Sequence, residues 1–423
     1  MSKLIIQRLS LFLIFTLIVT GCLADVVGSG PEVPIVVLWH SFSGEEGKAL
    51  QNLGDRFNRG AGANFTLIVE YQEDIFEKVT SADPERHPDL VVVSPEDLKR
   101  YHEAGLALPL PIDSPDVAEE MADLLPMARA LYTVDGAMRA LPLGLASYVL
   151  YYNVNWSREL GYDPGDATLT DLREAACAAT NIEGGQIGLG VPSQPGLFLA
   201  LLATGGVSPF DTTGSLQLEQ ESILNTGNVL RALFDEGCGE LFEVSDEGIQ
   251  QFGNSTLAFL GGSTLQKARV EAAVAAESNF PAAVAPLPGL QDPGLSLWYG
   301  PGLLLLAPPG ARRDAALEVI GWLLDPEAQR AWDAATQYLP VRRSLVAQQL
   351  TEEDDLRPLE RGLLELALSA ADEGHWAVLS ASVVSEPVCR TTLVRSLINL
   401  SEGQSAEEVL QQAGQTCSKE VRP

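Results

Sequence analysis

Positive charge is scarce in this sequence. There are 27 Lys and Arg residues against 57 Asp and Glu residues, which gives a formal net charge of −30. A surface of this sign repels the phosphates of nucleic acids and anionic lipid headgroups, so we expect no nucleic-acid partner. A single arginine can still hold an anion locally, because salt screens the distant charges.

The usual motifs of catalytic and metal sites are missing as well. The histidines are His40, His87, His102 and His375, which have no metal-ligand spacing, and no Cys-x-x-Cys occurs. We therefore predict no metal and no other cofactor. Neither Gly-x-Ser-x-Gly nor His-Glu-x-x-His is present, which argues against an enzyme. Paired carboxylates in so acidic a chain leave a secreted hydrolase as an alternative.

Long apolar runs are confined to the N-terminus. Lys3 and Arg8 precede an apolar stretch at residues 9–19, and small residues then lead to Cys22. The stretch is short for a membrane span and ends at a processing-like site. The order aliphatic, small, Gly, Cys resembles the bacterial lipobox, which implies that Cys22 is lipidated. We predict a signal peptide at 1–21, a tether at 22–32 and an exported lipoprotein on the outer side of the cell membrane. A plain anchor helix is the alternative.

Four cysteines remain after Cys22. They are Cys177, Cys238, Cys389 and Cys417, which allow three pairings. We favour Cys177–Cys238 and Cys389–Cys417, because each pair would tie one local substructure together. Four buried free thiols are the alternative.

Strands and helices alternate in the first part of the chain. Apolar runs at 34–39, 65–71 and 89–93 are typical of buried strands, and segments at 45–58, 73–80 and 96–104 have helical spacing. This alternation predicts an α/β domain with a parallel sheet. At roughly 150 residues per domain, a chain of 423 residues has room for two or three domains.

The pattern changes near residue 141. A strand-rich stretch at 142–153 is followed by helical segments, a strand at 256–260 that leads into Gly261 and Gly262, and a helix after it. Residues 281–302 hold five prolines and four glycines, and we expect them to be irregular. The last part of the chain is helical, with segments at 357–372, 390–401 and 405–414.

Several stretches, taken in order, resemble family 1 of the extracellular solute-binding proteins of ABC importers. They lie at 38–58, 141–172, 252–263, 285–289 and 322–342. The resemblance implies an α/β fold of the periplasmic-binding-protein type II, with two α/β lobes joined by a multi-strand hinge. It places lobe one at 33–142 plus 296–338 and lobe two at 143–295 plus 339–423, in a monomer.

Ligands of open α/β sheets bind beyond the carboxyl ends of the strands. This rule selects Trp39, His40, Ser41, Tyr71 and Ser94 after the first three strands, and Gly262 and Ser263 after the strand at 256–260. A sugar needs polar partners for its hydroxyls and flat aromatic surface for its C–H faces, and these candidates supply both. For Ser94, which precedes a proline, a helix N-cap is the alternative role. Strand-end core positions are the alternative for Trp39 and His40.

The crossovers implied by the resemblance add further candidates. Ser147 lies at the first crossover, Trp298, Tyr299 and Gly300 at the second, and Tyr338 just before the third. A branch of the family that binds glycerol 3-phosphate has an arginine near the place of Arg390, and a guanidinium is suited to holding phosphate. A surface salt bridge is the alternative for Arg390.

The leading functional prediction is a lipid-anchored solute-binding protein. It would capture a sugar or related polyol between its lobes and deliver it to the membrane subunits of an ABC permease. Binding of glycerol 3-phosphate or a glycerophosphodiester is the alternative on the same fold. A secreted hydrolase and a ligand sensor for a membrane receptor are alternatives of another class.

Overall fold

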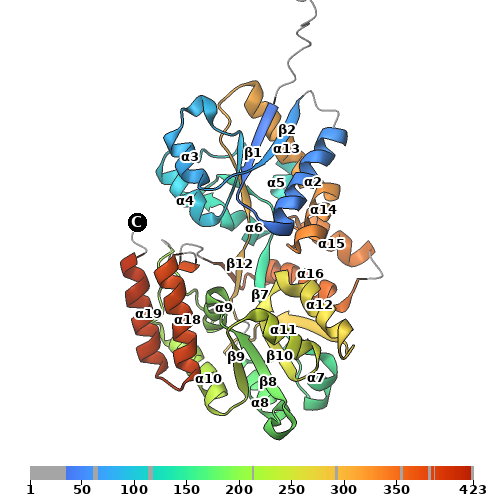
Figure 1. Ribbon diagram of the computed structural model, residues 1–423, viewed down its shortest axis with the longest axis vertical. Helices are drawn as coiled ribbons and strands as arrows, with labels where there is room; N and C mark the ends of the chain where they lie inside the picture. The colour runs from blue at the N-terminus through green and yellow to red at the C-terminus, as the bar shows by residue number, and fades with distance from the viewer. Residues whose placement is uncertain are drawn as a thin grey trace, which may run out of the picture.

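The computed structural model describes residues 35–60, 65–112, 118–211, 214–290, 294–352, 356–379, 383–384 and 386–420. The predicted signal peptide, Cys22 and the tether lie outside these residues. Within the described ranges, no helix is long and apolar enough to cross a membrane. The described residues form two α/β lobes, one above the other in Figure 1, with strands passing between them. The predicted two-lobe α/β fold is confirmed.

Lobe one is built on a five-stranded sheet. In spatial order its strands are β2 (Thr66–Tyr71), β1 (Ile35–His40), β3 (Leu90–Val93), β13 (Gly302–Leu305) and β6 (Ala140–Pro142). β1 pairs in parallel with β2 and β3, and β13 runs antiparallel to β3 and β6. The predicted parallel sheet therefore holds for β1, β2 and β3, whose carboxyl ends share one edge.

Helices cover this sheet because their apolar residues recur on one face. In α2 (Gly44–Gly60) the predicted face of Leu50, Leu53 and Phe57 is buried. The other elements of lobe one are α3 (Ile75–Ser81), η1 (Pro84–Arg86), α4 (Pro95–Glu103), α5 (Ala118–Ala122), α6 (Pro126–Leu131), β4 (Thr133–Val134), β5 (Ala137–Met138), α13 (Ala311–Leu324) and α14 (Pro326–Thr336).

Lobe two is built on a seven-stranded sheet. In spatial order its strands are β14 (Trp376–Val378), β12 (Ser296–Tyr299), β7 (Ala146–Asn153), β10 (Leu257–Ser263), β8 (Ile187–Pro192) and β9 (Gly239–Phe242), and β11 (Ala282–Pro286) also pairs with β7. The parallel pairs are β8–β9, β8–β10 and β12–β14, and the strands beside β7 are antiparallel to it.

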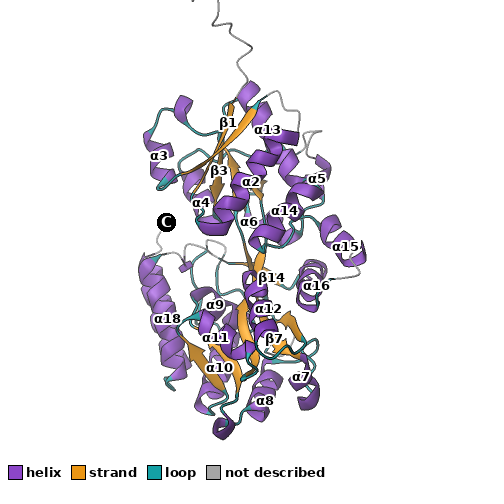
Figure 2. Cartoon of the chain, turned by 45° about the vertical axis from the view of Figure 1, so that its right-hand side comes forward, coloured by secondary structure: helices purple, strands orange, loops and turns teal. Residues whose placement is uncertain are grey.

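Helices cover both faces of the lobe-two sheet, as Figure 2 shows. They are α7 (Val154–Leu160), α8 (Leu169–Ala179), η2 (Ile182–Gly184), α9 (Pro195–Ala203), α10 (Glu221–Asp235), α11 (Ser245–Gly253), η3 (Thr264–Gln266), α12 (Lys267–Ala276), α16 (Pro358–Glu373), α18 (Pro387–Ser401) and α19 (Ala406–Glu420), with α15 (Arg343–Glu352) beside α16. The core under α11, α12 and α16 is continuous with the core of lobe one, and α8, α9, α10, α18 and α19 cover a second core.

Three segments cross between the sheets, and we call them the hinge. Residues 143–145 join β6 to β7, residues 300–301 join β12 to β13, and Leu339 forms a bridge with Leu145. The carbonyl oxygen of Gly144 lies only 2.0 Å from the place where a Cβ of Gly300 would stand. The hinge strands therefore approach each other as closely as their backbones permit. The lobe boundaries along the chain stay a prediction.

Gly300→Ala is expected to destabilise the fold. Its methyl group would overlap the Gly144 carbonyl, which belongs to the backbone and cannot rotate away. Overpacking of this kind costs about 1–3 kcal/mol of unfolding free energy, which urea unfolding would measure. Gly414→Ala in α19 is the matched control, because a Cβ there meets nothing within 4 Å. An equal response of the two variants would contradict the expectation.

The prediction that residues 281–302 are irregular is wrong. β11 and β12 lie within this segment, and β13 begins at its end. The prolines and glycines lie mostly between these strands, and Pro286 is the last residue of β11, where a missing N–H is tolerated. The strand predicted at 256–260 extends further than expected, because β10 continues through Gly261 and Gly262 to Ser263, opposite Tyr148 of β7.

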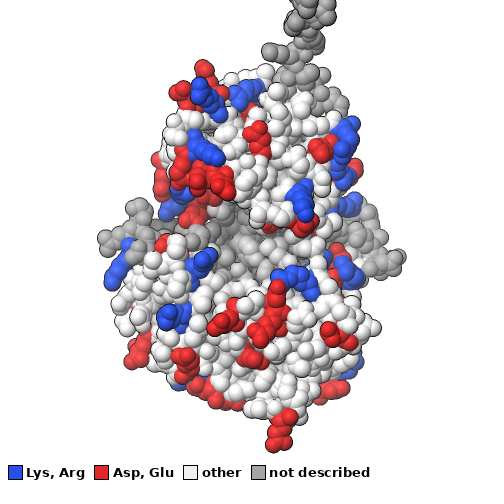
Figure 3. All heavy atoms as spheres, in the orientation of Figure 1, with Lys and Arg blue, Asp and Glu red and all other residues white. Residues whose placement is uncertain are grey.

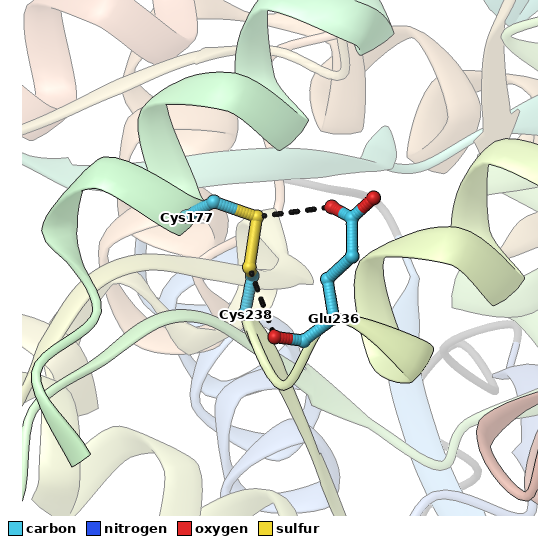
Figure 4. A group of neighbouring side chains, drawn as sticks. All are labelled: Cys177, Glu236 and Cys238. Carbon is cyan, nitrogen blue, oxygen red and sulfur yellow. Dashed lines mark hydrogen bonds between the residues drawn. A yellow bond between two sulfur atoms is a disulfide. The ribbon is translucent and has the colours of Figure 1, made fainter.

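The predicted disulfides are confirmed as Cys177–Cys238 and Cys389–Cys417. The first ties the end of α8 to the start of β9, and the second ties α18 to α19. In Figure 4 the Glu236 carboxylate approaches Cys177, with Oε2 3.3 Å from Sγ. Cys177, Glu236 and Cys238 have the spacing of metal ligands. The two sulfurs are bonded to each other, however, so they supply neither thiolates for a metal nor a thiol proton for Glu236.

Candidate functional site between the lobes

The carboxyl ends of β1, β2 and β3 carry the first group of predicted residues. His40 ends β1 with only 4 % of its surface exposed, and burial lowers the pKa of its imidazole. The exposed ring of Tyr71 lies edge-on to His40, with 6.0 Å between ring centroids. The structure thus brings His40 and Tyr71 together, and the lowered pKa of His40 favours the neutral form of its imidazole.

The other strand-end candidates of lobe one have local partners. The Trp39 indole Nε1 donates to Glu70 Oε2 at 2.9 Å on the lobe surface. Ser94 is the N-cap of α4 and forms a capping box with Asp97, which is its alternative role. Ser41 is exposed just before α2, and its side chain forms no hydrogen bond with any other residue in the described ranges.

The predicted Tyr338, together with Phe42, Glu46 and Trp332, which the sequence did not single out, completes lobe one's side of the site. Glu46, in the first turn of α2, accepts a 3.0 Å hydrogen bond from the Tyr338 hydroxyl. The Tyr338 ring lies parallel to Trp332 at 6.1 Å, and Trp332 lies 5.9 Å from Phe42. We call Phe42, Glu46, Trp332 and Tyr338 the lobe-one wall.

The opposite side is formed by lobe two and the hinge. Ser263 ends β10, caps η3 by accepting from the Leu265 N–H at 3.1 Å, and lies 2.6 Å from the Tyr299 hydroxyl through its Oγ. The Tyr299 ring packs against Tyr148 with 5.4 Å between centroids. We call Tyr148, Ser263 and Tyr299 the lobe-two wall.

Electrostatics connect the two walls. Burial raises the pKa of Tyr299 to about 12, its bonds to Ser263 and Tyr148 oppose that shift, and the carboxylate of Glu46 adds to it. Burial also raises the pKa of Tyr338, with Glu46 as the next cause and Tyr299 contributing. The Glu46 carboxylate thus acts on the phenols of both Tyr299 and Tyr338. Both phenols stay protonated at neutral pH and can donate hydrogen bonds.

Some predicted residues lie within the lobe-two sheet or the hinge instead. Ser147 of β7 and Trp298 of β12 have no exposed surface. The Ser147 hydroxyl donates to the Leu297 carbonyl at 2.9 Å, and Trp298 Nε1 donates to Ser296 Oγ at 3.0 Å. Gly262 lies within β10 against the Tyr151 ring, and Gly300 is the hinge glycine described above. The contact of these four residues with a solute stays a prediction.

Arg390 lies in the first turn of α18 and is exposed. Among the described residues no ion pair involves it, so the structure supplies no partner for the alternative role of a salt bridge.

The surface is hollowed between the lobes in Figure 3. A cavity of about 200 Å³ lies at this level, lined by residues of α12, α14, α15 and α16 and by Tyr338. A cavity of about 230 Å³ lies inside lobe two, away from the strand ends, and shares only Tyr148 with the walls. We place the candidate site between the walls, because strand ends and hydroxyl groups of both lobes converge there.

Phe42, Glu46 and Trp332 carried weak signals in the sequence. Phe42 and Glu46 lie within the turn and helix start that follow β1, where the strand-end rule applies to the whole loop. Trp332 lies on a predicted helix, where an aromatic residue is ordinarily a core residue. Its position beside Phe42 and Tyr338 depends on how α14 packs on α2.

Solved structures share this architecture at low sequence identity. The cyclic α-maltosyl-1,6-maltose-binding protein of Arthrobacter globiformis has a TM-score of 0.71 and 17% identity, covering 91% of this chain and 98% of its own. The sugar-binding protein MalE of Xanthomonas citri has a TM-score of 0.72 and 18% identity, covering 91% and 96%. UgpB of Mycobacterium tuberculosis, solved with glycerophosphocholine, has a TM-score of 0.66 and 19% identity, covering 93% and 99%.

Sequence comparison supplies the family. No curated protein matches the sequence. The family model for bacterial extracellular solute-binding proteins matches residues 52–358, which span most of both lobes. This chain belongs to the bacterial extracellular solute-binding protein family.

Proposed function

We propose that this protein captures a sugar or related polyol between its lobes and delivers it to an ABC importer. The observation that carries the proposal is the meeting of hydroxyls and aromatic rings from both lobes. Ser263 and Tyr299 bond to each other at 2.6 Å, Tyr338 donates to Glu46 at 3.0 Å, and the charge of Glu46 acts on Tyr299. Hydroxyl-rich solutes need such donors and acceptors together with flat apolar surface.

Charge favours a neutral solute. The ionised group in the two walls is Glu46, whose carboxylate accepts hydrogen bonds from hydroxyls and repels phosphate. The similar proteins from A. globiformis and X. citri are, by their names, a maltosyl-maltose-binding and a sugar-binding protein. A glycerophosphodiester is the second candidate, favoured by the exposed Arg390, which has no ion pair within the described residues.

We further propose binding without turnover. Members of the matched family are binding proteins. Turnover of a glycoside panel by the purified protein would contradict this proposal.

The proposed route after capture has three parts. The mature chain is held on the outer face of the membrane by lipid on Cys22, works as a monomer and docks on permease membrane subunits. Loss of labelled-lipid incorporation in Cys22→Ala, without loss of export, tests the anchor.

A binding screen tests the proposed ligand class. The mature protein is heated with neutral saccharides, sugar alcohols and glycerophosphodiesters in turn, and hits are measured by calorimetry. A ligand at 100 times its Kd stabilises the folded state by about 2.7 kcal/mol, which a melting curve detects. Stabilisation by a neutral sugar or polyol that persists in Arg390→Gln supports the leading proposal. Stabilisation only by phosphodiesters, lost in Arg390→Gln, supports the second, and no stabilisation by any class contradicts both.

A further inference from the structure

The cavity of about 200 Å³ between the lobes has one helix from lobe one on one side and helices of lobe two on the other. α14, which packs on α2 in lobe one, supplies Arg330, Asp333 and Gln337. Lys267 at the start of α12 and Glu360 on α16 lie across the cavity. In Figure 1 these helices lie to the right of the strands that join the lobes.

The charges on the lobe-two side are paired with one another. Lys267 Nζ lies 3.3 Å from Glu360 Oε1, and its side chain is 12% exposed. Arg357 Nη1 lies 2.6 Å from Glu271 Oε2, and its Nε is 3.9 Å from Glu360 Oε2. The four groups form a chain of alternating sign, so their charges balance one another.

Asp333, on the lobe-one side of the cavity, has no ion pair of this kind among the described residues. Both of its carboxylate oxygens are shut off from solvent, and neither has a hydrogen-bond partner among the described residues. Burial raises the pKa of Asp333 well above its usual value, and the charge on Lys267 opposes part of that shift. A buried carboxyl group without a partner is costly, so this arrangement of the lobes leaves Asp333 unsatisfied.

Lys267 is the cation that a change in lobe arrangement would bring to Asp333. Among the described residues that line the cavity, the cations are Lys267 and Arg330. Arg330 is on the same helix as Asp333 and moves with it. Lys267 is carried by the other lobe, and its four-carbon side chain allows its ammonium group to change partners.

We propose that Lys267 exchanges its partner between two arrangements of the lobes. In the arrangement described here it pairs with Glu360 inside lobe two, and in a second arrangement it pairs with Asp333 across the lobes. Asp333 and Glu360 thus compete for one ammonium group, and their balance sets the population of each arrangement before any solute binds. This device does not depend on which solute the protein captures.

Distances between spin labels on the two lobes test the exchange. Cysteines placed at Leu108 in lobe one and Ile182 in lobe two carry the labels, because both positions are exposed. The probe is the full mature chain without added ligand, measured by pulsed electron spin resonance. We expect two distance populations in the labelled parent protein. Asp333→Asn and Lys267→Met remove the second population, and Glu360→Gln raises its ratio to the first about fivefold or more.

The opposite effects expected of Asp333→Asn and Glu360→Gln on the second population distinguish this exchange of partners from a purely structural role of the residues. Glu360→Gln combined with Asp333→Asn is expected to behave as Asp333→Asn alone, and Arg330→Gln is the matched control that changes neither population. Circular dichroism confirms that each variant is folded. The proposal is overturned by a single population that no variant changes, by shifts of the same sign in Asp333→Asn and Glu360→Gln, or by an Arg330→Gln variant that behaves as Asp333→Asn.

Discussion

Tyr299→Ala is expected to weaken solute binding by about 2–4 kcal/mol, which is roughly 30- to 1,000-fold in Kd. Tyr299 is the last residue before the hinge and holds Ser263 at 2.6 Å while its ring packs on Tyr148. Truncation removes the aromatic surface and the hydroxyl in one step. Calorimetric titration with the sugar or polyol that stabilises the parent protein most measures the loss.

Two further variants divide this effect between ring and hydroxyl. Tyr299→Phe keeps the ring and loses the hydroxyl with its hydrogen bonds to Ser263 and Tyr148, so we expect a smaller loss of about 0.5–1.5 kcal/mol. Tyr162→Phe is the matched control, because the Tyr162 hydroxyl is buried in lobe two with no partner among the described residues. An unchanged Kd in Tyr299→Ala would remove Tyr299 from the site, and a loss in Tyr162→Phe would point to a general effect on folding.

Removal of the Cys177–Cys238 disulfide in the double variant Cys177→Ala/Cys238→Ala is expected to cost about 4 kcal/mol of unfolding free energy. The bond joins residues 61 apart, so the unfolded chain without it gains the freedom of a long loop. The unfolding entropy of about 2.1 cal/mol/K per residue makes 1 kcal/mol equal to about 1 °C in a chain of 423 residues, so the melting temperature should fall by roughly 4–5 °C. Differential scanning calorimetry measures the change.

Reducing agent supplies the control for this prediction. Dithiothreitol should lower the melting temperature of the parent protein and have a smaller effect on the double variant, which retains only Cys389–Cys417. The second disulfide closes a loop of 28 residues, so Cys389→Ala/Cys417→Ala should cost slightly less, about 3.5 kcal/mol. A double variant at 177 and 238 that melts with the parent protein would mean that the bond adds no stability.

Local patterns predicted the elements of the fold well. The apolar runs of β1, β2 and β3 and the helical faces of α2 and α8 follow from the spacing of a few neighbouring residues. The segment at 281–302 was misread because its prolines and glycines mark turns, while β11 and β12 between them are short and depend on β7 for their hydrogen bonds. Such strands have little local signal of their own.

The candidate site was predicted in part. Strand ends led to Ser263, and the family resemblance led to Tyr299 and Tyr338, which the structure places in the two walls. Trp298 was named for the same reason as Tyr299, yet it is fully buried within lobe two. Adjacent residues of a strand point to opposite sides, so which of the two lies toward the site depends on the pairing of β12 with β7.

The amino-acid sequence by itself determined four features: the acidic surface, the alternation of strands and helices, the four cysteines and the ordered stretches shared with solute-binding proteins. Tertiary packing decided which side chains lie near one another. Glu46 and Tyr338 form a hydrogen bond although they are 292 residues apart, and Asp333 and Lys267 line one cavity although different lobes carry them. The physical reason is the distance along the chain over which each kind of pattern carries information. The periodicity of a sequence reports the surroundings of a residue only within a few positions. A site between lobes depends on contacts between residues far apart in the chain, and these form only when the two cores and the hinge assemble.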